Sequence, residues 1–312
     1  MKVVMPGGSG FLGRALADAL LQDGHEVVVL TRALQPGVVV HEAGTGLPGL
    51  SNAGWRPDGT DGAGQWAAVV DGADAVVNLT GESIAARRWS TAQKTRIRDS
   101  RVLATQSVVG AIRVAANPPA TLVNASAIGY YGNRDDEELD EASSAGDDFL
   151  AGSCVDWEAA AREAEASIHR LVILRGGVAL DRNGGPLERM VLPFKLFVGG
   201  PLGSGRQYIS WIHRADWVDL VRWVLATPTA AGVLNATAPA PVTNLEFSKA
   251  LGHALDRPSF LPTPPFALRL ALGELADALL LGGQRVLPSK ALELGFSFRF
   301  STITHALVSI LQ

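Results

Sequence analysis

The sequence predicts an α/β fold with a doubly wound parallel sheet, and three observations lead to this prediction. An apolar strand at residues 1–6 runs directly into a glycine turn at 7–13 and then into a helix with an apolar stripe. Helical patterns separate the strand-like segments, and each crossover helix must cover one face of a sheet. A continuously apolar segment, typical of a strand buried on both faces of a parallel sheet, lies at 75–80, and further strand-like segments occur at 26–31, 121–126 and 171–175.

The glycine turn has the spacing of a dinucleotide-binding site. Gly7 lets the chain turn off the strand, Gly10 lets backbone N–H groups approach a pyrophosphate, and Gly13 lets the helix pack against the sheet. The helix that begins near Phe11 directs its unpaired N–H groups and its positive dipole end at the phosphates. An ordinary tight turn is the alternative, and the strand–turn–helix order argues against it. The turn residues predicted to bind the cofactor are Gly7, Ser9, Gly10, Phe11, Leu12 and Gly13.

The end of the second strand indicates which dinucleotide is bound. Sites that prefer NAD usually carry Asp or Glu there, because a carboxylate accepts hydrogen bonds from the ribose hydroxyls. This chain has Thr31 and Arg32 instead, and the arginine can form a charge-assisted pair with a 2′-phosphate. NADP(H) is therefore the predicted cofactor. The alternative is a solvated loop arginine and a loose choice of cofactor.

Composition and charge exclude several classes of protein. The net charge of −4 and the pI of about 5.9 give no electrostatic basis for binding nucleic acid or an anionic membrane. The single cysteine, Cys154, excludes an internal disulfide, and with no signal peptide expected we predict a cytoplasmic protein. The six histidines are scattered without metal-ligand spacing, so no metal site is expected. Residues 265–281 are apolar but contain three charged side chains. This pattern predicts a core helix with one solvent-exposed face and argues against a membrane span.

The change of pattern after Gly176 predicts two parts. Residues 1–176 are expected to form the NADP(H)-binding domain of Rossmann type, completed by 212–238. Residues 177–312 are expected to form a smaller, mainly helical substrate-binding part, with a family-specific segment from about residue 260. Asp216 is predicted to cap the helix that runs to Leu225, in preference to acting as a catalytic acid. Further elements are expected as helices at 91–116 and 153–169, a weak strand near Trp55 within the glycine-rich stretch 44–64, and a short strand at 296–300.

The strand-end residues resemble the extended short-chain dehydrogenase/reductase superfamily, in its NAD(P)-dependent epimerase/dehydratase branch. The resemblance lies in the glycine turn, in Asn78–Glu82 and in Ala125–Gly132. The chain is also similar, over nearly its whole length, to a bacterial and organellar subgroup. Members of that subgroup are named epimerase-family proteins or nucleoside-diphosphate-sugar epimerases, and some are named cell-division inhibitors. The stretches that carry this second similarity are 81–89, 203–207, 210–213, 239–244 and 282–288.

The resemblance implies a catalytic serine on the fifth strand and a Tyr-x-x-x-Lys pair on the next helix. In the superfamily the lysine lowers the pKa of the tyrosine, which then exchanges a proton with substrate while hydride moves to or from nicotinamide. Ser126 matches the serine, but the Tyr-Lys pair is missing. Four residues after the three tyrosines stand Arg134, Asp135 and Ile212, and the helix offers Cys154 with Glu158 or Gly152 with Asp156.

Several polar and aromatic side chains are candidates for the site. Ser126 and Glu82 are the candidate catalytic groups, and for Glu82 a helix-capping or buried, paired role is the alternative. Arg206 and Gln207, beside a glycine loop, are candidates for holding an anionic substrate, with a solvated or structural ion pair as the alternative. Other expected cofactor contacts are Thr31, Arg32, Leu79, Thr80, Gly81, Glu82, Ser126 and Arg175, and expected substrate contacts are Tyr130, Tyr131, Arg206, Gln207 and Trp211.

Two functions are consistent with these observations. The first is an NADP(H)-dependent oxidoreductase or epimerase-like enzyme that acts on a small polar, perhaps nucleotide-linked, substrate. The second is a regulatory or interaction protein that binds NADP(H) and has lost catalysis, as the missing Tyr-Lys pair and the cell-division names of some relatives suggest. The expected state is a monomer or a homodimer. Substrate, reaction direction and the acid/base group stay open.

Overall fold

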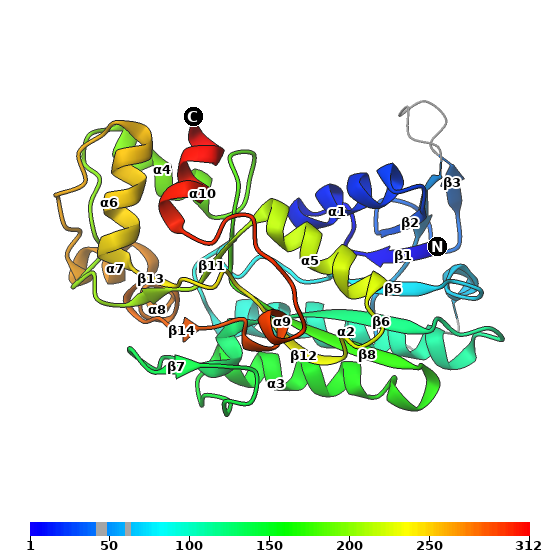
Figure 1. Cartoon of the computed structure of the whole chain (residues 1–312). Coiled ribbons are helices and arrows are strands. Elements are labelled where there is room, and N and C mark those ends of the chain that lie inside the picture. The colour runs from blue at the N-terminus through cyan, green and yellow to red at the C-terminus, as the bar shows by residue number, and fades with distance from the viewer. Residues whose placement is uncertain (42–48, 60–63) are drawn as a thin grey trace.

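The structure is a computed structural model that describes residues 1–41, 49–59 and 64–312. A parallel sheet with helices on both faces forms one part, and a smaller, mainly helical part lies beyond the carboxyl ends of the strands (Figure 1). This arrangement confirms the predicted fold class. Within the described residues, no helix combines the length and apolar character needed to cross a bilayer.

The main sheet has the strand order β12-β8-β6-β5-β1-β2-β4-β3. All neighbouring strands are parallel except β3, which runs antiparallel to β4. The strand order reverses between β1 and β5, and such a reversal opens a crevice at the carboxyl ends of the strands. The strands are β1 (Lys2–Pro6), β2 (Glu26–Thr31), β3 (Val39–His41), β4 (Leu50–Gly54), β5 (Ala75–Asn78), β6 (Thr121–Ala127), β8 (Arg170–Gly176) and β12 (Gly232–Ala236).

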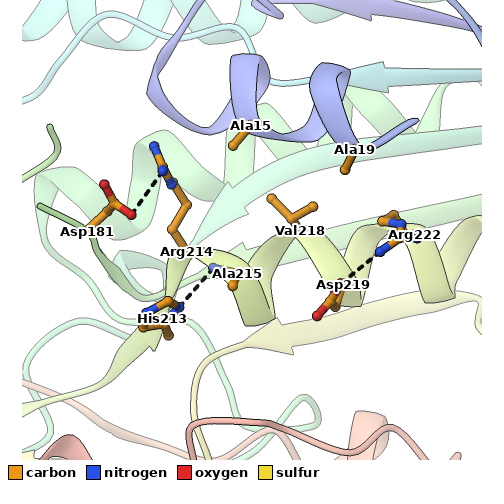
Figure 2. A pocket seen from close by; sticks show the side chains of 9 residues that line it. All are labelled: Ala15, Ala19, Asp181, His213, Arg214, Ala215, Val218, Asp219 and Arg222. Atoms are coloured by element: carbon orange, nitrogen blue, oxygen red, sulfur yellow. Dashed lines mark hydrogen bonds and ion pairs between the residues drawn. The ribbon is translucent and has the colours of Figure 1, made fainter. Parts of the chain in front are cut away.

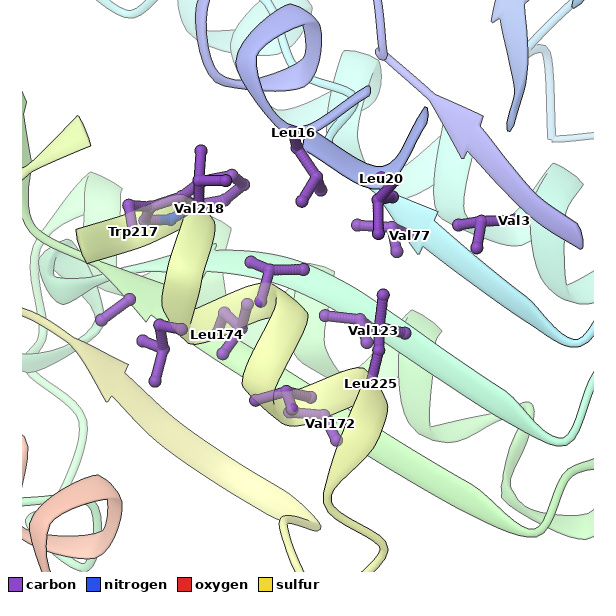
Figure 3. Close-up of a cluster of buried hydrophobic side chains, with 14 of the residues drawn as sticks. Val3, Leu16, Leu20, Val77, Val123, Val172, Leu174, Trp217, Val218 and Leu225 are labelled. Atoms are coloured by element: carbon purple, nitrogen blue, oxygen red, sulfur yellow. The ribbon is translucent and has the colours of Figure 1, made fainter. Parts of the chain in front are cut away.

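Two pairs of helices cover the two faces of this sheet. The helices α1 (Phe11–Gln22) and α5 (Arg214–Ala226) lie on one face, and α2 (Thr91–Val114) and α3 (Phe149–Arg162) lie on the other (Figure 1). Both faces are apolar because each strand alternates its buried side chains between them. The core under α1 and α5 includes Val3, Leu16, Leu20, Val77, Val123, Val172, Leu174, Trp217, Val218 and Leu225 (Figure 3).

The C-terminal part has its own core, which includes Trp211, Phe247 and Leu307. Its strands are short: β9 (Val178–Leu180) pairs with β11 (Trp211–His213), β10 (Tyr208–Ile209) with β13 (Val242–Thr243), and β14 (Arg285–Val286) with β7 (Glu138–Leu139). Its helices are α4 (Leu187–Lys195), α6 (Asn244–Leu255), α7 (Pro265–Leu272), α8 (Glu274–Ala276), α9 (Ser289–Glu293) and α10 (Ile303–Leu311).

Short helical turns complete the structure at 65–69, 128–131, 165–167 and 277–281. The predicted strand near Trp55 ends one residue earlier, at Gly54, and the prediction missed β3 altogether. Part of the stretch 44–64 lies outside the described residues. The pattern was weak here because β4 reads Leu-Ser-Asn-Ala-Gly, in which small and polar residues hide the strand.

The helix predicted at 153–169 is displaced toward the N-terminus. α3 begins at Phe149 because the Asp148 side chain caps it, accepting a hydrogen bond from the Ala151 N–H at 2.8 Å. It ends at Arg162, and a single 3₁₀ turn, Glu165–Ser167, leads into β8. The helix predicted at 91–116 ends two residues early, at Val114.

Two predictions about the last fifty residues were wrong. Residues 265–281 do not form a core helix, because Gly273 adopts a left-handed φ of +64° that ends α7, and α7 contains no buried residue. Residues 296–300 do not form a strand. The backbone N–H groups of Arg299 and Phe300 instead donate to the two carboxylate oxygens of Asp216, both at 2.9 Å.

Asp216 is therefore not the cap of α5. His213 has that place, with its Nδ1 accepting from the Ala215 N–H at 3.0 Å, and burial lowers the pKa of this histidine to about 4. Asp216 lies in the first turn of α5 and is completely buried. Its carboxylate joins α5 to the C-terminal segment, which excludes contact with a substrate as well.

We expect Asp216→Ala to lower the free energy of unfolding by about 2 kcal/mol or more, because it leaves two buried N–H donors without an acceptor. Urea unfolding followed by circular dichroism measures this loss. The control is Asp99→Ala, which removes only an exposed pair with Arg98 at 3.5 Å and should cost less than about 0.5 kcal/mol. Equal midpoints for the two variants would contradict the bridging role.

Candidate dinucleotide-binding and catalytic site

The glycine turn is held in close contact with the end of β5. Gly7 has a φ of +79°, and a Cβ there would lie 2.7 Å from the backbone of Leu79. A Cβ on Gly13 would lie 2.6 Å from the carbonyl oxygen of Gly7. The helix α1 can therefore pack this closely against the turn only because residue 13 is glycine. The Leu79 N–H donates to Pro6 O at 2.8 Å and joins the ends of β1 and β5. These contacts give Gly7 and Gly13 the packing reasons that their spacing predicts.

Gly10 differs from the other two glycines. It is the N-cap of α1, with an ordinary φ of −77°, and it is exposed. A Cβ there would meet only the Gly7 carbonyl oxygen, at 3.2 Å. No side chain caps α1 and its first turn has no acidic residue, so the N–H groups that start this helix are available to an anion. Glycine at position 10 therefore leaves room for an anion beside the start of α1, and the fold itself does not require it.

The start of α1 is covered on one side by the loop after β9. The Phe11 ring packs under Gly184 and Gly185, where Cβ atoms would approach it to 3.0 and 2.8 Å, and Arg214 Cζ lies 5.4 Å from its centroid. Leu12 is half-buried, and Ser9 is exposed, with its carbonyl accepting from Arg14 Nε at 2.8 Å. Phe11 therefore anchors the turn, and Ser9 is open to solvent.

The end of β2 presents an exposed cation. Thr31 Oγ1 accepts from the Ala33 N–H at 3.1 Å and turns the chain away from the sheet. Arg32 follows and is exposed. A parallel sheet brings the carboxyl ends of its strands to one edge, so Arg32 shares that edge with the glycine turn.

The residues after β5 include a hydroxyl that lacks a partner. The buried side chain of Asn78 donates to Thr105 Oγ1 and Asn124 Oδ1, at 2.9 and 2.7 Å, and accepts from the Thr80 N–H at 3.2 Å. Thr80 Oγ1 is buried and has no hydrogen-bond partner among the described residues. Such orphaned groups mark places where a bound ligand or water completes the bonding, and they are costly otherwise. Together with the open start of α1, this atom fits a ligand at the edge shared by β1 and β5.

Arg101, on α2, is a site residue that the sequence reasoning missed. Its guanidinium lies against Gly81, where a Cβ would meet Arg101 Cζ at 3.1 Å. Nη1 donates to Ile97 O at 2.7 Å and Cζ lies 5.3 Å from the Trp157 ring, but no described carboxylate forms an ion pair with it. Burial lowers the pKa of this guanidinium, because a desolvated cation without a counter-ion is costly. An arginine within a helix carries no sequence signal for this placement.

Glu82 is tied to α2. Its Oε1 accepts from Gln93 Nε2 at 2.9 Å, and its N–H donates to Ser100 Oγ at 3.0 Å. The carboxylate also contributes to the electrostatic field at Arg101. These bonds match the paired alternative considered for this residue.

A buried ion pair lies beside Ser126, and its carboxylate, Glu158, belongs to α3, the helix on which the Tyr-Lys pair was expected. Arg175 Nε and Nη2 donate to the two carboxylate oxygens of Glu158 at 2.8 and 2.9 Å, and both side chains are 4% exposed. Ser126 Oγ donates to Glu158 Oε1 at 2.7 Å. The Ser126 proton is therefore committed to Glu158, and Ser126 can offer a ligand only its lone pairs. Burial opposes the charge of Arg175, but the bonds and charge of Glu158 outweigh it and raise the Arg175 pKa.

The two adjacent tyrosines have different roles. Tyr131 is fully buried, donates to Asn235 Oδ1 at 2.7 Å and accepts from Arg175 Nη1 at 3.0 Å, and burial raises its pKa to about 12. The prediction that Tyr131 contacts substrate was wrong, because it has no exposed surface. Tyr130 is partly exposed, and Arg175 Cζ lies 3.3 Å from its ring centroid. Its hydroxyl has no hydrogen bond in the part of the chain that the structure describes.

The structure distinguishes between the two pairs of positions on α3 that could correspond to the missing Tyr-Lys pair. Cys154 and Glu158 lie one helical turn apart on the buried face, whereas Gly152 faces open space and Asp156 pairs with the exposed Arg98 at 2.7 Å. Of the two sequence registers, Cys154 with Glu158 is the one beside Ser126. Burial raises the pKa of the Cys154 thiol to about 11, so it is protonated at neutral pH.

Two further residues predicted to contact substrate serve the fold of the C-terminal part. Trp211 is completely buried, with Nε1 donating to Ala240 O at 3.0 Å, and the prediction for it was wrong for the same reason as for Tyr131. Gln207 Nε2 donates to the carbonyls of Leu202 and Leu280, at 2.9 and 2.7 Å. Arg206 is exposed after the glycine loop and stays a prediction.

A pocket of about 370 Å³ lies between α1 and α5 (Figure 2). Ala15 and Ala19 of α1 line it from one side and Val218 and Arg222 of α5 from the other, and an ion pair of Arg214 with Asp181 at 3.0 Å lies at one end. None of its lining residues belongs to the predicted site. Among the described residues, no three His, Cys, Asp or Glu side chains gather as metal ligands would.

Fold and site together define a dinucleotide-binding protein of the extended short-chain dehydrogenase/reductase type. The model of the NAD dependent epimerase/dehydratase family matches residues 3–151, and a domain of unknown function matches 263–310. An epimerase family protein of Mycobacterium bovis is 45% identical over 98% of this chain and 96% of its own length. The chain therefore belongs to the epimerase family, as the sequence resemblance predicted.

Relatives in eukaryotes are similar over the same length. The chloroplastic homologue of epimerase family protein SDR39U1 in Arabidopsis thaliana is 42% identical, with 100% of this chain and 87% of the relative covered. A crystal structure of human SDR39U1 with NADPH has a TM-score of 0.87 and 36% identity, covering 100% of this chain and 99% of the human one. The human relative thus binds the cofactor that the sequence predicts for this chain.

We expect Gly10→Val to fold normally and to abolish dinucleotide binding, because its side chain fills the space beside the open N–H groups and not the core. Calorimetric titration with NADPH measures the loss, and circular dichroism checks the fold. Gly152→Val is the matched control, since a Cβ at Gly152 meets nothing within 4 Å. A folded Gly10→Val protein that binds NADPH like the control would mean that the phosphates lie elsewhere.

Proposed function

We propose that this chain binds NADP(H) and uses it as an oxidoreductase or epimerase-like enzyme on a small polar, possibly nucleotide-linked, substrate. One observation carries the proposal. The open start of α1, the exposed Arg32 after β2 and Arg101, which has no ion-pair partner among the described residues, lie at the carboxyl edge of the sheet, where the strand order reverses. The human relative bound to NADPH supports it. Residues 177–312 would then supply the substrate side of the crevice.

The first test of the proposal is cofactor preference. NADPH should bind more tightly than NADH, and Arg32→Ala should remove most of the difference. A charge-assisted contact to the 2′-phosphate is worth about 1.5 to 3 kcal/mol, or roughly ten- to a hundredfold in affinity. Titration of both cofactors measures this, and Arg113→Ala, an exposed arginine at the far end of α2, is the control. Equal affinities for both cofactors in the unmutated protein would exclude the Arg32 assignment.

Arg101 provides a contrast within the same titration. It lies at the end of β5, against Gly81, where the two cofactors are chemically identical. Arg101→Met should weaken NADPH and NADH alike, while Arg98→Met, on the exposed face of the same helix, should weaken neither. A selective loss of NADPH in Arg101→Met would place the 2′-phosphate at Arg101 and not at Arg32.

The bound cofactor would supply or accept hydride at its nicotinamide ring. For the accompanying proton we propose Tyr130, since its phenol is free of hydrogen bonds within the described residues. Arg175 lies on its ring face, where a cation stabilises negative charge that develops as the proton leaves. Ser126 would accept a hydrogen bond from a substrate hydroxyl. In the reducing direction the Tyr130 proton passes to the carbonyl oxygen as hydride adds to its carbon, and solvent restores the phenol.

A second candidate is a regulatory protein that binds NADP(H) without catalysis. The observation that favours it is the buried Glu158–Arg175 pair, which fixes the Ser126 proton and replaces the usual phenol-lysine chemistry. A cytoplasmic location is proposed for both candidates from the single buried cysteine. The chloroplastic Arabidopsis relative indicates that the compartment differs among relatives.

The chemistry is tested by a screen of NADPH oxidation against carbonyl compounds and of nucleotide-sugar epimerisation. Tyr130→Phe and Ser126→Ala should each lower turnover by roughly ten- to a thousandfold with NADPH affinity unchanged, because proton transfer and positioning act in the transition state. Cys154→Ser should change little, since its thiol is protonated. A larger loss in Cys154→Ser than in Tyr130→Phe would overturn the assignment, and inactivity on every substrate would favour the regulatory candidate.

A further inference from the structure

A second exposed arginine follows β4, the strand that pairs with β2. Trp55, the first residue after β4, is 3% exposed and belongs to the core under α2 and α3, where its ring meets that of Trp66 edge to face with 5.4 Å between the centroids. Arg56 comes next and is exposed. It makes no hydrogen bond, ion pair or ring contact with any residue that the structure describes. Its charge is therefore available to a ligand.

Arg32 and Arg56 leave the sheet from adjacent strand ends. In the parallel register of β2 and β4, Thr31 lies opposite Gly54, and the Trp55 N–H donates to Thr31 O at 3.1 Å. Arg32 is the next residue after Thr31, and Arg56 follows Trp55. Because neighbouring strands are only about 4.8 Å apart, the two guanidinium groups can reach the same ligand group at this edge.

The loop that carries Arg32 is fastened to the end of β4. The Gly37 N–H donates to Gly54 O at 3.0 Å, and the Gly54 N–H donates to Val38 O at 2.9 Å. Gly54 also packs against the carbonyl oxygen of Gln35, so closely that a Cβ would have no room there. These contacts fix the loop after Arg32 relative to the end of β4.

The backbone of Arg56 is restricted by the residues on either side of it. Pro57 follows, and a residue before proline favours extended conformations. In extended backbone successive side chains point to opposite sides, so the burial of Trp55 directs Arg56 away from the core. The exposed guanidinium is thus attached to a preorganised backbone, and binding costs little more than the ordering of one side chain.

The charge at these two strand ends selects the ligand group. A phosphate monoester carries about −1.5 to −2 charges at pH 7, so Arg32 alone would leave roughly half of that charge without a counter-ion. Residues 31–38 and 53–57 contain no Asp or Glu, so these segments do not repel a dianion. Two guanidinium groups match it, because each can donate two parallel hydrogen bonds to phosphate oxygens.

We propose that Arg56 is a second specificity-determining residue for NADP(H), which binds the 2′-phosphate together with Arg32. This inference rests on the proposed function, in which the cofactor lies along the carboxyl edge with its 2′-phosphate at the end of β2. It adds that the preference for NADP(H) over NAD(H) depends on the ends of both β2 and β4. The two arginines lie far apart in the sequence, and only the pairing of these strands brings them together.

Titration of the full chain with NADPH and NADH tests the second contact. Arg56→Ala should raise the dissociation constant for NADPH roughly tenfold and leave that for NADH unchanged, because only NADPH has the 2′-phosphate. Arg56→Lys should recover part of the loss, since lysine keeps the charge but not the paired donors. The double variant Arg32→Ala with Arg56→Ala should bind both cofactors equally. Circular dichroism should show an unchanged fold, because Arg56 is exposed and makes no bond to a described residue.

Arg162→Ala is the matched control. Arg162 is an exposed arginine at the end of α3, where it pairs with Glu165 at 3.3 Å, and α3 ends shortly before β8 begins, at the amino edge of the sheet. This variant should bind both cofactors like the unmutated protein.

The same titration separates this inference from the proposed function. If Arg32→Ala loses the preference for NADPH while Arg56→Ala keeps it, the second contact is wrong and the proposed function stands. An equal loss of NADPH and NADH in Arg56→Ala would place Arg56 at the adenosine that both cofactors share, and would also overturn the inference. If the unmutated protein binds neither cofactor, the proposed function fails and the inference fails with it.

Discussion

The buried ion pair between Glu158 and Arg175 is the interaction on which the site depends. It joins α3 to β8, and through Ser126 and Tyr131 it extends to β6 and, by way of Asn235, to β12. Removal of either partner would leave an uncompensated charge in a nonpolar environment, at a cost of about 3–5 kcal/mol. This network therefore fixes the relative positions of the strand ends at the carboxyl edge of the sheet. Tyr130 is positioned by its contact with the Arg175 guanidinium.

Two cations near this edge differ in how they are balanced. Arg175 is paired with both carboxylate oxygens of Glu158, whereas Arg101 is desolvated and has no ion-pair partner among the described residues. A paired cation is held in one position, and a cation without a counter-ion keeps its affinity for an anion.

Both parts of the chain follow the same rule of apolar burial, with different results. The sheet is apolar on both faces, and α1 and α5 cover one core while α2 and α3 cover the other. In the C-terminal part α6 and α10 supply a covered core, but α7 lies outside it. Its exposed side chains Phe266 and Leu270 lie in the segment that matches a domain of unknown function.

The sequence by itself determined the features that depend on neighbours along the chain. The strand, glycine turn and helix at the N-terminus, the buried parallel strands, the lack of a carboxylate at Thr31–Arg32 and the missing Tyr-Lys pair are all local patterns. Contacts between distant residues were decided only by the tertiary structure. Packing between segments far apart in the chain determines which residue pairs with Arg175 and brings Arg101 to Gly81. The same packing buries Tyr131 and Trp211 and leaves Phe266 exposed. Local hydropathy cannot distinguish a helix that its own fold covers from one that its fold leaves exposed, because both need the same apolar face.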